Sequence, residues 1–189
     1  MKKATHKGIC QVCGRQQRLP GDFVSKHGYT VEWGWFNGVC PGSDELPFEK
    51  SKDLIDKAIE DVKQNIVALQ EEIETVTADG FTDFVWVHHY GQLKMSHKSG
   101  YTWMKVQPVK ELRREGSKYT AWYYYVEGSE KRKELQMYGQ GDELTDVCRT
   151  FNERYANTLR KRIKGGHEYI TWQEARIKDW KETDCEPIK

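Results

Sequence analysis

The chain has 189 residues, of which 37% are hydrophobic and 12% aromatic, so it carries enough buriable surface for a folded core. Its 30 basic and 29 acidic residues leave a net charge of +1, which excludes the bulk basicity of many nucleic-acid and lipid binders. No apolar run approaches the ~20 residues of a membrane span, and the first residues lack the apolar core of a signal peptide. We therefore expect a cytoplasmic protein with no membrane partner.

Residues 1–48 form the first predicted section, which is rich in Gly and Pro and has no sustained periodicity. Such a section cannot build a core alone and needs an external staple. The chain has five cysteines, an odd number, and a reducing compartment disfavours disulfides, so clustered cysteines indicate metal ligands. We predict a zinc-binding module at 1–48 and an α+β domain at 49–189.

Cys10 and Cys13 have the C-x-x-C spacing that places two thiolates on one tight turn. His27 and Cys40 complete a Cys3His set for tetrahedral zinc, with His6 as a substitute for His27. Four protein ligands leave no open position, so the predicted zinc is structural. Two other interpretations stay open: a thioredoxin-like redox pair, which needs a βαβ setting that this section lacks, and unrelated cysteines beside a surface histidine.

Four short motifs surround the predicted ligands. They are Cys10-Gln-Val-Cys13-Gly14-Arg15, Lys26-His27-Gly28-Tyr29, Gly34-Trp35-Phe36, and Gly38-Val39-Cys40 with Gly42. Together they resemble a group of small zinc-knuckle proteins carried by bacteriophages and plasmids. The resemblance is limited to this first section. It implies the same ligand set and a mobile genetic element in a bacterial host as the source, but no activity.

Residues 51–79 predict one long amphipathic helix. Its apolar residues alternate steps of four and three, at Ile55, Ile59, Val62, Ile66, Leu69, Ile73 and Val76. Ser51 is the predicted amino cap, and Asp79-Gly80 ends the run. The heptad spacing suits packing within the chain, and a homodimer is the second choice, so the protein is expected to be a monomer or a homodimer.

Residues 81–138 are rich in aromatic and β-branched residues and predict an antiparallel sheet of about four strands. A helix follows at 142–164, where Gly165-Gly166 is expected to stop it, and a second helix at 171–182 begins with a capping box. The predicted fold is therefore α+β: a zinc knuckle, a long helix, a sheet and a carboxy-terminal helical pair.

His88 and His97 are a candidate second site. If Gly91-Gln92 forms a two-residue hairpin turn, these histidines become diagonal neighbours on one face of the hairpin. Such a pair could bind a metal or transfer a proton in a nuclease or other hydrolase. No carboxylate accompanies them on the predicted strands, so ordinary polar surface is the simpler interpretation.

A basic cluster lies over residues 149–164 of the helix predicted at 142–164. Its members are Arg149, Arg154, Arg160, Lys161, Arg162 and Lys164. They could contact a protein partner or the phosphates of a nucleic acid. A solvated outer face, or a partner for the acidic helix at 51–79, is the alternative.

The run Trp122-Tyr123-Tyr124-Tyr125 is dense enough in rings to offer a stacking platform for bases. Alternation along a strand places at least one pair of these rings toward the core. Core packing is therefore the simpler interpretation.

The sequence contains no nucleophile-base set, phosphate-binding glycine loop or H-E-x-x-H motif, so we expect no enzyme. The primary prediction is a non-catalytic, zinc-stabilised binding protein of phage or plasmid type. Within that class we expect an inhibitor of a host protein complex, such as an anti-CRISPR-like protein directed at a defence target. Nucleic-acid binding through the basic cluster is the alternative, and a metal-dependent nuclease or hydrolase is the third.

Overall fold

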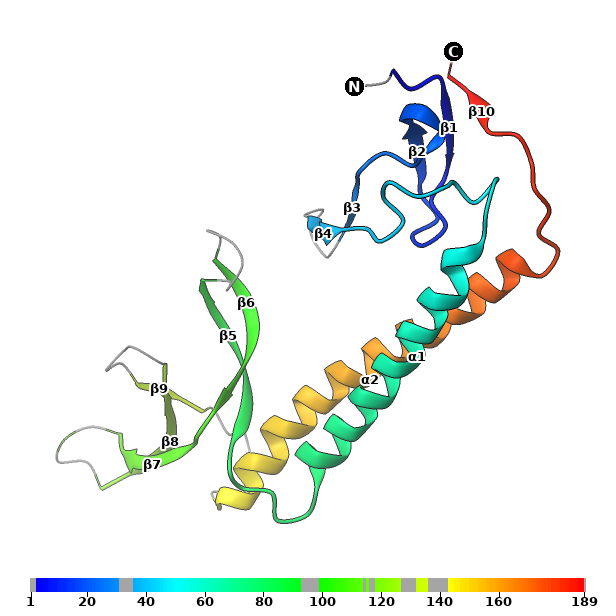
Figure 1. Cartoon of the computed structure of the whole chain (residues 1–189). Helices are drawn as coiled ribbons and strands as arrows, with labels where there is room; N and C mark the ends of the chain where they lie inside the picture. Colours follow the sequence, from blue (N-terminus) through cyan, green and yellow to red (C-terminus); the bar gives the residue numbers. More distant parts are fainter. Residues whose placement is uncertain are drawn as a thin grey trace. The chain divides into compact units, whose positions relative to one another are not determined.

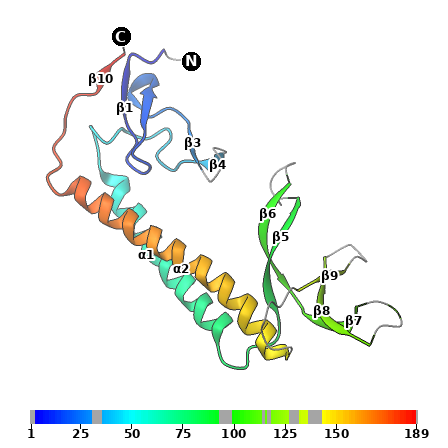
Figure 2. The same ribbon diagram turned by 180° about the vertical axis from the view of Figure 1, so that it is seen from behind.

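The computed structural model describes residues 3–30, 36–92, 99–113, 115, 118–126, 132–135 and 143–188. Their helices and antiparallel strands confirm the predicted α+β class (Figure 1 and Figure 2). Packing divides the chain into a first unit, Met1–Ile66 with Gly165–Lys189, and a second unit, Val67–Lys164. Both boundaries fall inside long helices. Within the described residues, no helix is both long and apolar enough to cross a membrane.

The first unit contains a small antiparallel sheet in the order β10-β1-β2. Strands β1 (His6–Ile9) and β2 (Gln16–Leu19) pair as a hairpin. Strand β10 (Glu186–Pro187) adds to the free edge of β1. Segments near the two ends of the chain therefore pair in one sheet.

Between β2 and the first long helix, the first unit has little regular structure, as the composition of this section predicts. A short 3-10 helix, η1 (Pro20–Asp22), follows β2, and β3 (Gly28–Thr30) pairs with β4 (Phe36–Val39). The buried apolar cluster here is small and includes two of the predicted metal ligands: Cys10, Leu19, Val24 and Cys40. A core of this size supplies little stability by itself, so a metal crosslink would add much.

Helix α1 (Asp53–Thr77) confirms the helix predicted at 51–79. The Ser51 hydroxyl accepts a hydrogen bond from the Asp53 N–H at 3.1 Å, as an amino cap does. All seven apolar residues of the predicted stripe are buried or partly buried. In the second unit, Leu69 and Val76 join a core with α2, so the stripe is used for packing within the chain.

Helix α2 (Leu144–Ile177) is one helix where the sequence predicts two, at 142–164 and 171–182. The predicted carboxy-terminal helical pair is therefore wrong. Gly166 does not end a helix but lies against α1, where an added Cβ would come within 3.0 Å of Ile66 Cδ1. Packing against α1 and the rest of the chain outweighs the roughly 1 kcal/mol that each glycine costs a helix interior.

Substitutions at the two adjacent glycines should change stability in opposite directions. Gly165→Ala should raise the free energy of unfolding by up to about 1 kcal/mol, because position 165 faces open space and alanine favours helix. Gly166→Val should lower it by about 1–3 kcal/mol, because the branched side chain would overlap Ile66 and Val62. Denaturant unfolding measures both shifts. A Gly166→Val protein as stable as the wild type would contradict the close helix contact.

The second unit holds two separate antiparallel sheets where the sequence predicts one. Strand β5 (Val85–Gln92) pairs with β6 (Ser99–Val106). Strands β7 (Val109–Leu112), β8 (Thr120–Tyr125) and β9 (Arg132–Glu134) form the other sheet in the order β7-β8-β9. The single predicted sheet is therefore wrong. A proline, which has no N–H to donate to a strand ladder, stands between β6 and β7.

Two buried clusters hold the second unit together. The first lies between the sheets and the start of α2, and consists of Val85, Val87, Val106, Trp122, Tyr124, Leu135, Val147 and Cys148. The second joins α1 and α2, with the Trp86 ring stacked on Tyr155 at 4.3 Å. Asn152 fixes β5 to α2, because its buried side chain accepts from the Trp86 N–H at 3.1 Å and donates to the Phe84 carbonyl at 3.2 Å.

Candidate metal centre

The β1–β2 hairpin carries Cys10 and Cys13 in its turn. Two backbone hydrogen bonds close the turn, from the Cys10 N–H to the Arg15 carbonyl at 2.9 Å and from the Gly14 N–H to the Cys10 carbonyl at 3.0 Å. Gly14 has a φ of 67°, a conformation that a side chain would strain. Backbone N–H groups of the turn hydrogen-bond to both sulfurs, which favours thiolates there.

His27 and Cys40 supply the second pair of ligands from beside β3 and β4. The Cys40 N–H donates to the His27 carbonyl at 2.8 Å, which holds the two residues next to each other. The chain then turns, with the Ser43 N–H donating to the Cys40 carbonyl at 2.9 Å. A Cβ built on Gly42 in this turn would lie 2.4 Å from the Cys10 sulfur, so a side chain there would push the two halves apart.

The four predicted ligand atoms converge. The sulfurs of Cys10, Cys13 and Cys40 and a ring nitrogen of His27 all lie within 4.8 Å of one another. The Cys10 and Cys40 sulfurs are 3.8 Å apart, and His27 Nε2 lies 3.2 Å from the Cys13 sulfur. Two sulfurs bonded at about 2.3 Å to a tetrahedral zinc ion would be separated by roughly 3.8 Å. The cluster therefore has the dimensions of a zinc shell.

Neighbouring groups orient His27. Its Nδ1 donates to the Ser25 carbonyl at 2.9 Å and lies 3.2 Å from the Ser43 hydroxyl, which leaves Nε2 directed at Cys13. A metal-binding histidine commonly donates its second ring N–H to such a partner, which fixes the tautomer. His6, the substitute ligand considered above, is outside the cluster. The structure thus selects His27.

The three thiols differ in pKa when no metal is bound. Burial raises the pKa of Cys10 to about 12, and the nearby Cys13 and Cys40 thiolates add to this rise. Burial also raises the pKa of Cys40. Burial acts the same way on Cys13, but hydrogen bonds from Arg15 and the His27 ring outweigh it and lower the pKa to about 6. A divalent cation relieves the repulsion between thiolates, since a coordinated thiol is deprotonated outright.

The cluster is closed by protein. Cys10 and Cys40 are 0% and 2% exposed, and the four converging side chains offer the four donor atoms that a tetrahedral shell needs. Catalytic zinc keeps a position for water or substrate, whereas structural zinc does not. The donor set therefore fits a structural zinc ion that ties the β1–β2 hairpin to the β3–β4 segment.

Helix α2 holds the turn that carries the first two ligands. The Tyr169 hydroxyl donates to the Val12 carbonyl at 3.0 Å. Fully buried Gln173 donates through Nε2 to the Gln11 and Val12 carbonyls at 3.2 and 2.9 Å. Arg176 donates to the Gln11 carbonyl at 2.8 Å. Buried carbonyls need such partners, so the position of α2 and the shape of the turn depend on each other.

The Gln11 side chain connects the same turn to α1. Its Oε1 accepts from the Leu54 N–H at 2.9 Å, one of the first-turn N–H groups that an isolated helix leaves unpaired. Its Nε2 donates to the Leu46 carbonyl at 2.9 Å, and the residue is 2% exposed. Both helices of the first unit are therefore fixed to the turn between Cys10 and Cys13.

Acid should release the zinc. A thiol whose pKa is lowered on folding, as for Cys13, stabilises the folded state at high pH, and this contribution is lost as the pH falls through about 6. Protons also compete with zinc for every ligand. We expect release between roughly pH 6 and pH 4, measured with a zinc-sensitive dye. Zinc retained at pH 4 would contradict a shell that contains three thiolates, because protons compete with zinc for each sulfur.

The hairpin turn on which the predicted pairing of His88 with His97 depends is not formed. Strand β5 continues through Gly91-Gln92, so the turn predicted there is wrong, and His88 lies opposite Trp103 on β6. The register is unbroken there, with Gly91 opposite Gly100 and Gln92 opposite Ser99. The His88 and Trp103 ring centroids are 5.1 Å apart. His97 lies outside the described residues, and its role stays a prediction.

Five of the six basic residues of the predicted cluster lie on two flanks of α2. The first flank carries Arg149, Arg160 and Lys164. Arg149 forms an ion pair with Asp146, and Arg160 forms one with Glu153 at 2.6 Å. Lys164 also has an interaction partner. Much of the positive charge on this flank is therefore neutralised by α2 itself.

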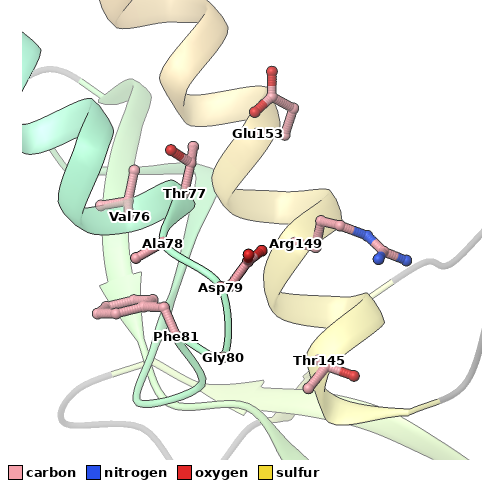
Figure 3. Close-up of a pocket in the computed structure, with 9 residues that line it drawn as sticks. All are labelled: Val76, Thr77, Ala78, Asp79, Gly80, Phe81, Thr145, Arg149 and Glu153. Atoms are coloured by element: carbon pink, nitrogen blue, oxygen red, sulfur yellow. The ribbon is translucent and has the colours of Figure 1, made fainter.

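A hollow of about 260 Å³ adjoins the first flank where α1 ends (Figure 3). Residues 76–81 line it together with Thr145, Arg149 and Glu153. In Figure 3 the Asp79 carboxylate points toward α2, and the Arg149 guanidinium points outward. The negative carboxylates of Asp79 and Glu153 would repel a phosphate bound in this hollow.

The other three basic residues do not share one line: Arg154 and Lys161 are seven residues apart and lie on one line of α2, the second flank, whereas Arg162 lies about 80° further round the helix. All three side chains are exposed. None has an ion pair with a residue that the structure describes. This flank, and not the first, presents uncompensated positive charge.

The aromatic run on β8 packs mainly inside the second unit. Trp122 and Tyr124 belong to the core between the sheets. Tyr123 is 5% exposed, and the Arg132 guanidinium lies over it, 4.2 Å from the centre of the Tyr123 ring. Tyr125 is 43% exposed. Core packing is confirmed for the first three rings, which leaves no stacking platform on this run.

The fold and the site define an α+β protein with a Cys3His metal-binding cluster in its first unit. No family model, curated protein or solved structure matches the chain. The cluster of Cys10, Cys13, His27 and Cys40 fits a zinc-binding knuckle.

Proposed function

We propose that this chain is a zinc-stabilised binding protein that acts without catalysis. The observation that carries the proposal is the closed Cys3His cluster, because its turn also anchors both helices of the first unit. A metal without an open coordination position contributes to shape and stability rather than to chemistry. The function then lies on the surfaces that this scaffold presents.

As partner we propose a protein complex of a bacterial host, such as a defence complex that the chain inhibits. Two features support this choice. The first section resembles zinc-knuckle proteins of phages and plasmids, and residues 49–79 carry nine acidic and four basic groups. Most of these acidic side chains are exposed on α1, where they complement a basic protein surface.

Affinity capture from bacterial lysate, with and without nuclease, tests this proposal. We expect the tagged chain to retain a discrete protein complex after nuclease treatment and to inhibit that complex when added to it. Replacing Glu60 and Asp61 by Gln and Asn should weaken capture, whereas the matched changes Lys57→Gln and Lys63→Gln should not. Metal-dependent turnover of a substrate by the purified chain would overturn the non-catalytic proposal.

Nucleic-acid binding is the second candidate function, and the uncompensated second flank of α2 favours it. Arg154, Lys161 and Arg162 can each neutralise a phosphate, which releases counterions and makes the affinity fall with salt. The nuclease arm of the capture experiment separates the two candidates. Capture that survives nuclease supports a protein partner, and capture that disappears supports a nucleic acid.

A further inference from the structure

A pocket of about 270 Å³ lies in the second unit, where the β5–β6 hairpin, β8, the end of β9 and α2 meet. Aromatic rings form much of its wall: His88 and Trp103 come from the hairpin, Tyr124 from β8 and Phe151 from α2. The volume is slightly below the ~300 Å³ at which pockets for drug-sized ligands begin, so a single planar ring system suits it.

On the hairpin side of the pocket, the Trp103 ring is held in place by the core, and the His88 ring beside it is exposed. Trp103 packs on Tyr155 with ring centroids 5.2 Å apart, so its orientation is set by the core. The His88 ring is tilted by 31° against Trp103, and His88 is exposed to solvent. Flat rings of this kind stack with any base, because every base has a π-face.

The polar groups of the pocket suit a ligand that carries both negative charge and N–H donors. The Arg154 guanidinium lies at the rim, 5.1 Å from the Phe151 ring centre, without an ion pair among the described residues. The Glu134 carboxylate is paired with Arg113 at 2.8 Å, and its remaining lone pairs can accept from a base edge. Arginine therefore contributes the free charge, and glutamate contributes an acceptor.

The positive charge continues away from the pocket along the second flank of α2. Lys161 follows Arg154 by two helical turns, about 10 Å along the axis, on the same line of the helix. Two cations at this spacing suit a chain of regularly spaced anions. An aromatic side chain of a protein with one carboxylate would use the rings and Arg154, but not Lys161 beyond them.

We propose that this pocket binds one base of a single-stranded nucleic acid, while Arg154 and Lys161 contact its phosphates. The proposal rests on the second candidate function and names the strand, the base site and the phosphate contacts. Stacking on Trp103 and His88 is tolerant of sequence, so little base preference is expected.

Titration of the full-length protein with a short oligothymidylate, and in parallel with thymidine monophosphate, tests the phosphate contacts. The strand should bind more tightly than the monophosphate, with an affinity that falls as salt rises. Arg154→Ala should weaken strand binding and reduce the salt slope by about 0.7. Arg149→Ala is the matched control, since Arg149 is paired with Asp146 on the other flank, and it should change neither value. A monophosphate that binds as tightly as the strand would overturn the proposal.

Two variants of the rings test the base site. His88→Ala should weaken strand binding about tenfold, whereas His88→Phe, which keeps a flat ring, should retain most of it. The strand should quench tryptophan fluorescence, and Trp103→Phe should bind while losing most of that quench.

The outcomes distinguish the pocket from the function on which it rests. Strand binding that depends on Arg154 and Lys161 but not on His88 would overturn the base site and keep the second candidate function. No strand binding at low salt would overturn both and leave the protein partner proposed above.

Discussion

The Cys10→Ser variant should lose its zinc and the fold of its first unit. Zinc bound to a structural site contributes on the order of 10 kcal/mol, comparable with the whole stability of a domain. The buried apolar cluster around the ligands is small, and Cys10 itself belongs to it. We expect zinc content to fall from one ion per chain to nearly none, and the amides of β1 and β2 to exchange like those of an unfolded chain. Metal analysis and hydrogen exchange measure the two effects.

Cys185→Ser is the matched control for this variant. Cys185 lies in the same unit and packs, partly buried, against the same apolar cluster, but it is not among the four converging ligands. It should keep one zinc ion and near-native exchange in β1 and β2. A Cys10→Ser protein that keeps full zinc content, or a Cys185→Ser protein that loses it, would show that the ligand set is misassigned.

The second large effect is expected on stability, from a substitution at Gln173, which is not a metal ligand. Gln173→Leu preserves much of the side-chain volume but leaves the carbonyls of Gln11 and Val12 without this donor in a buried site. Arg176 and Tyr169 still donate to these two carbonyls, so the variant loses two hydrogen bonds without leaving either carbonyl unpaired. At about 0.5–1.5 kcal/mol for each lost bond, we expect the free energy of unfolding to fall by roughly 1–3 kcal/mol. Denaturant unfolding measures the loss, and hydrogen exchange should show faster opening at the end of α2.

Glu174→Ala provides the comparison on the next residue of the same helix. Glu174 is exposed, so its replacement should change the free energy of unfolding by less than about 0.5 kcal/mol. If Gln173→Leu were as harmless as Glu174→Ala, the hydrogen bonds between α2 and the metal-binding turn would contribute nothing to stability. The link between metal site and helix would then be lost.

The features that were predictable from the sequence are those with a local pattern. The stripe from Ile55 to Val76 repeats over three heptads, and α1 follows it closely. The C-x-x-C pair and the later histidine and cysteine identify the metal cluster, because few other residue types bind zinc. The heptad stripe is a short-range pattern and the zinc ligands are chemically distinctive. Both can therefore be recognised without knowledge of the tertiary structure.

The features that were missed depend on contacts between distant parts of the chain. Gly165-Gly166 has the local form of a helix end, but the close approach of α1 at Ile66 requires a small residue inside a helix. Gln11 and Gln173 are 162 residues apart in the sequence, so no local spacing pattern predicts the hydrogen bond between them. The one available signal was a polar residue on the buried stripe of α2, between Ile170 and Ile177.

In the second unit, the local turn signal at Gly91-Gln92 was misleading. The strand pairing runs through it, with Gly91 opposite Gly100 and Gln92 opposite Ser99, because strand pairing depends on the partner strand as well as on the local turn signal. The basic cluster shows the same limit. Its six members are equivalent in the sequence, and only their ion-pair partners separate the two flanks of α2.

Zinc-edge X-ray absorption on the purified wild-type protein distinguishes a closed Cys3His shell from an open one. The cluster of Cys10, Cys13, His27 and Cys40 predicts one zinc ion per chain, bound by three sulfurs at about 2.3 Å and one nitrogen at about 2.0 Å. A shell with fewer sulfurs, or with an oxygen ligand from water, would contradict a structural metal and reopen a catalytic one.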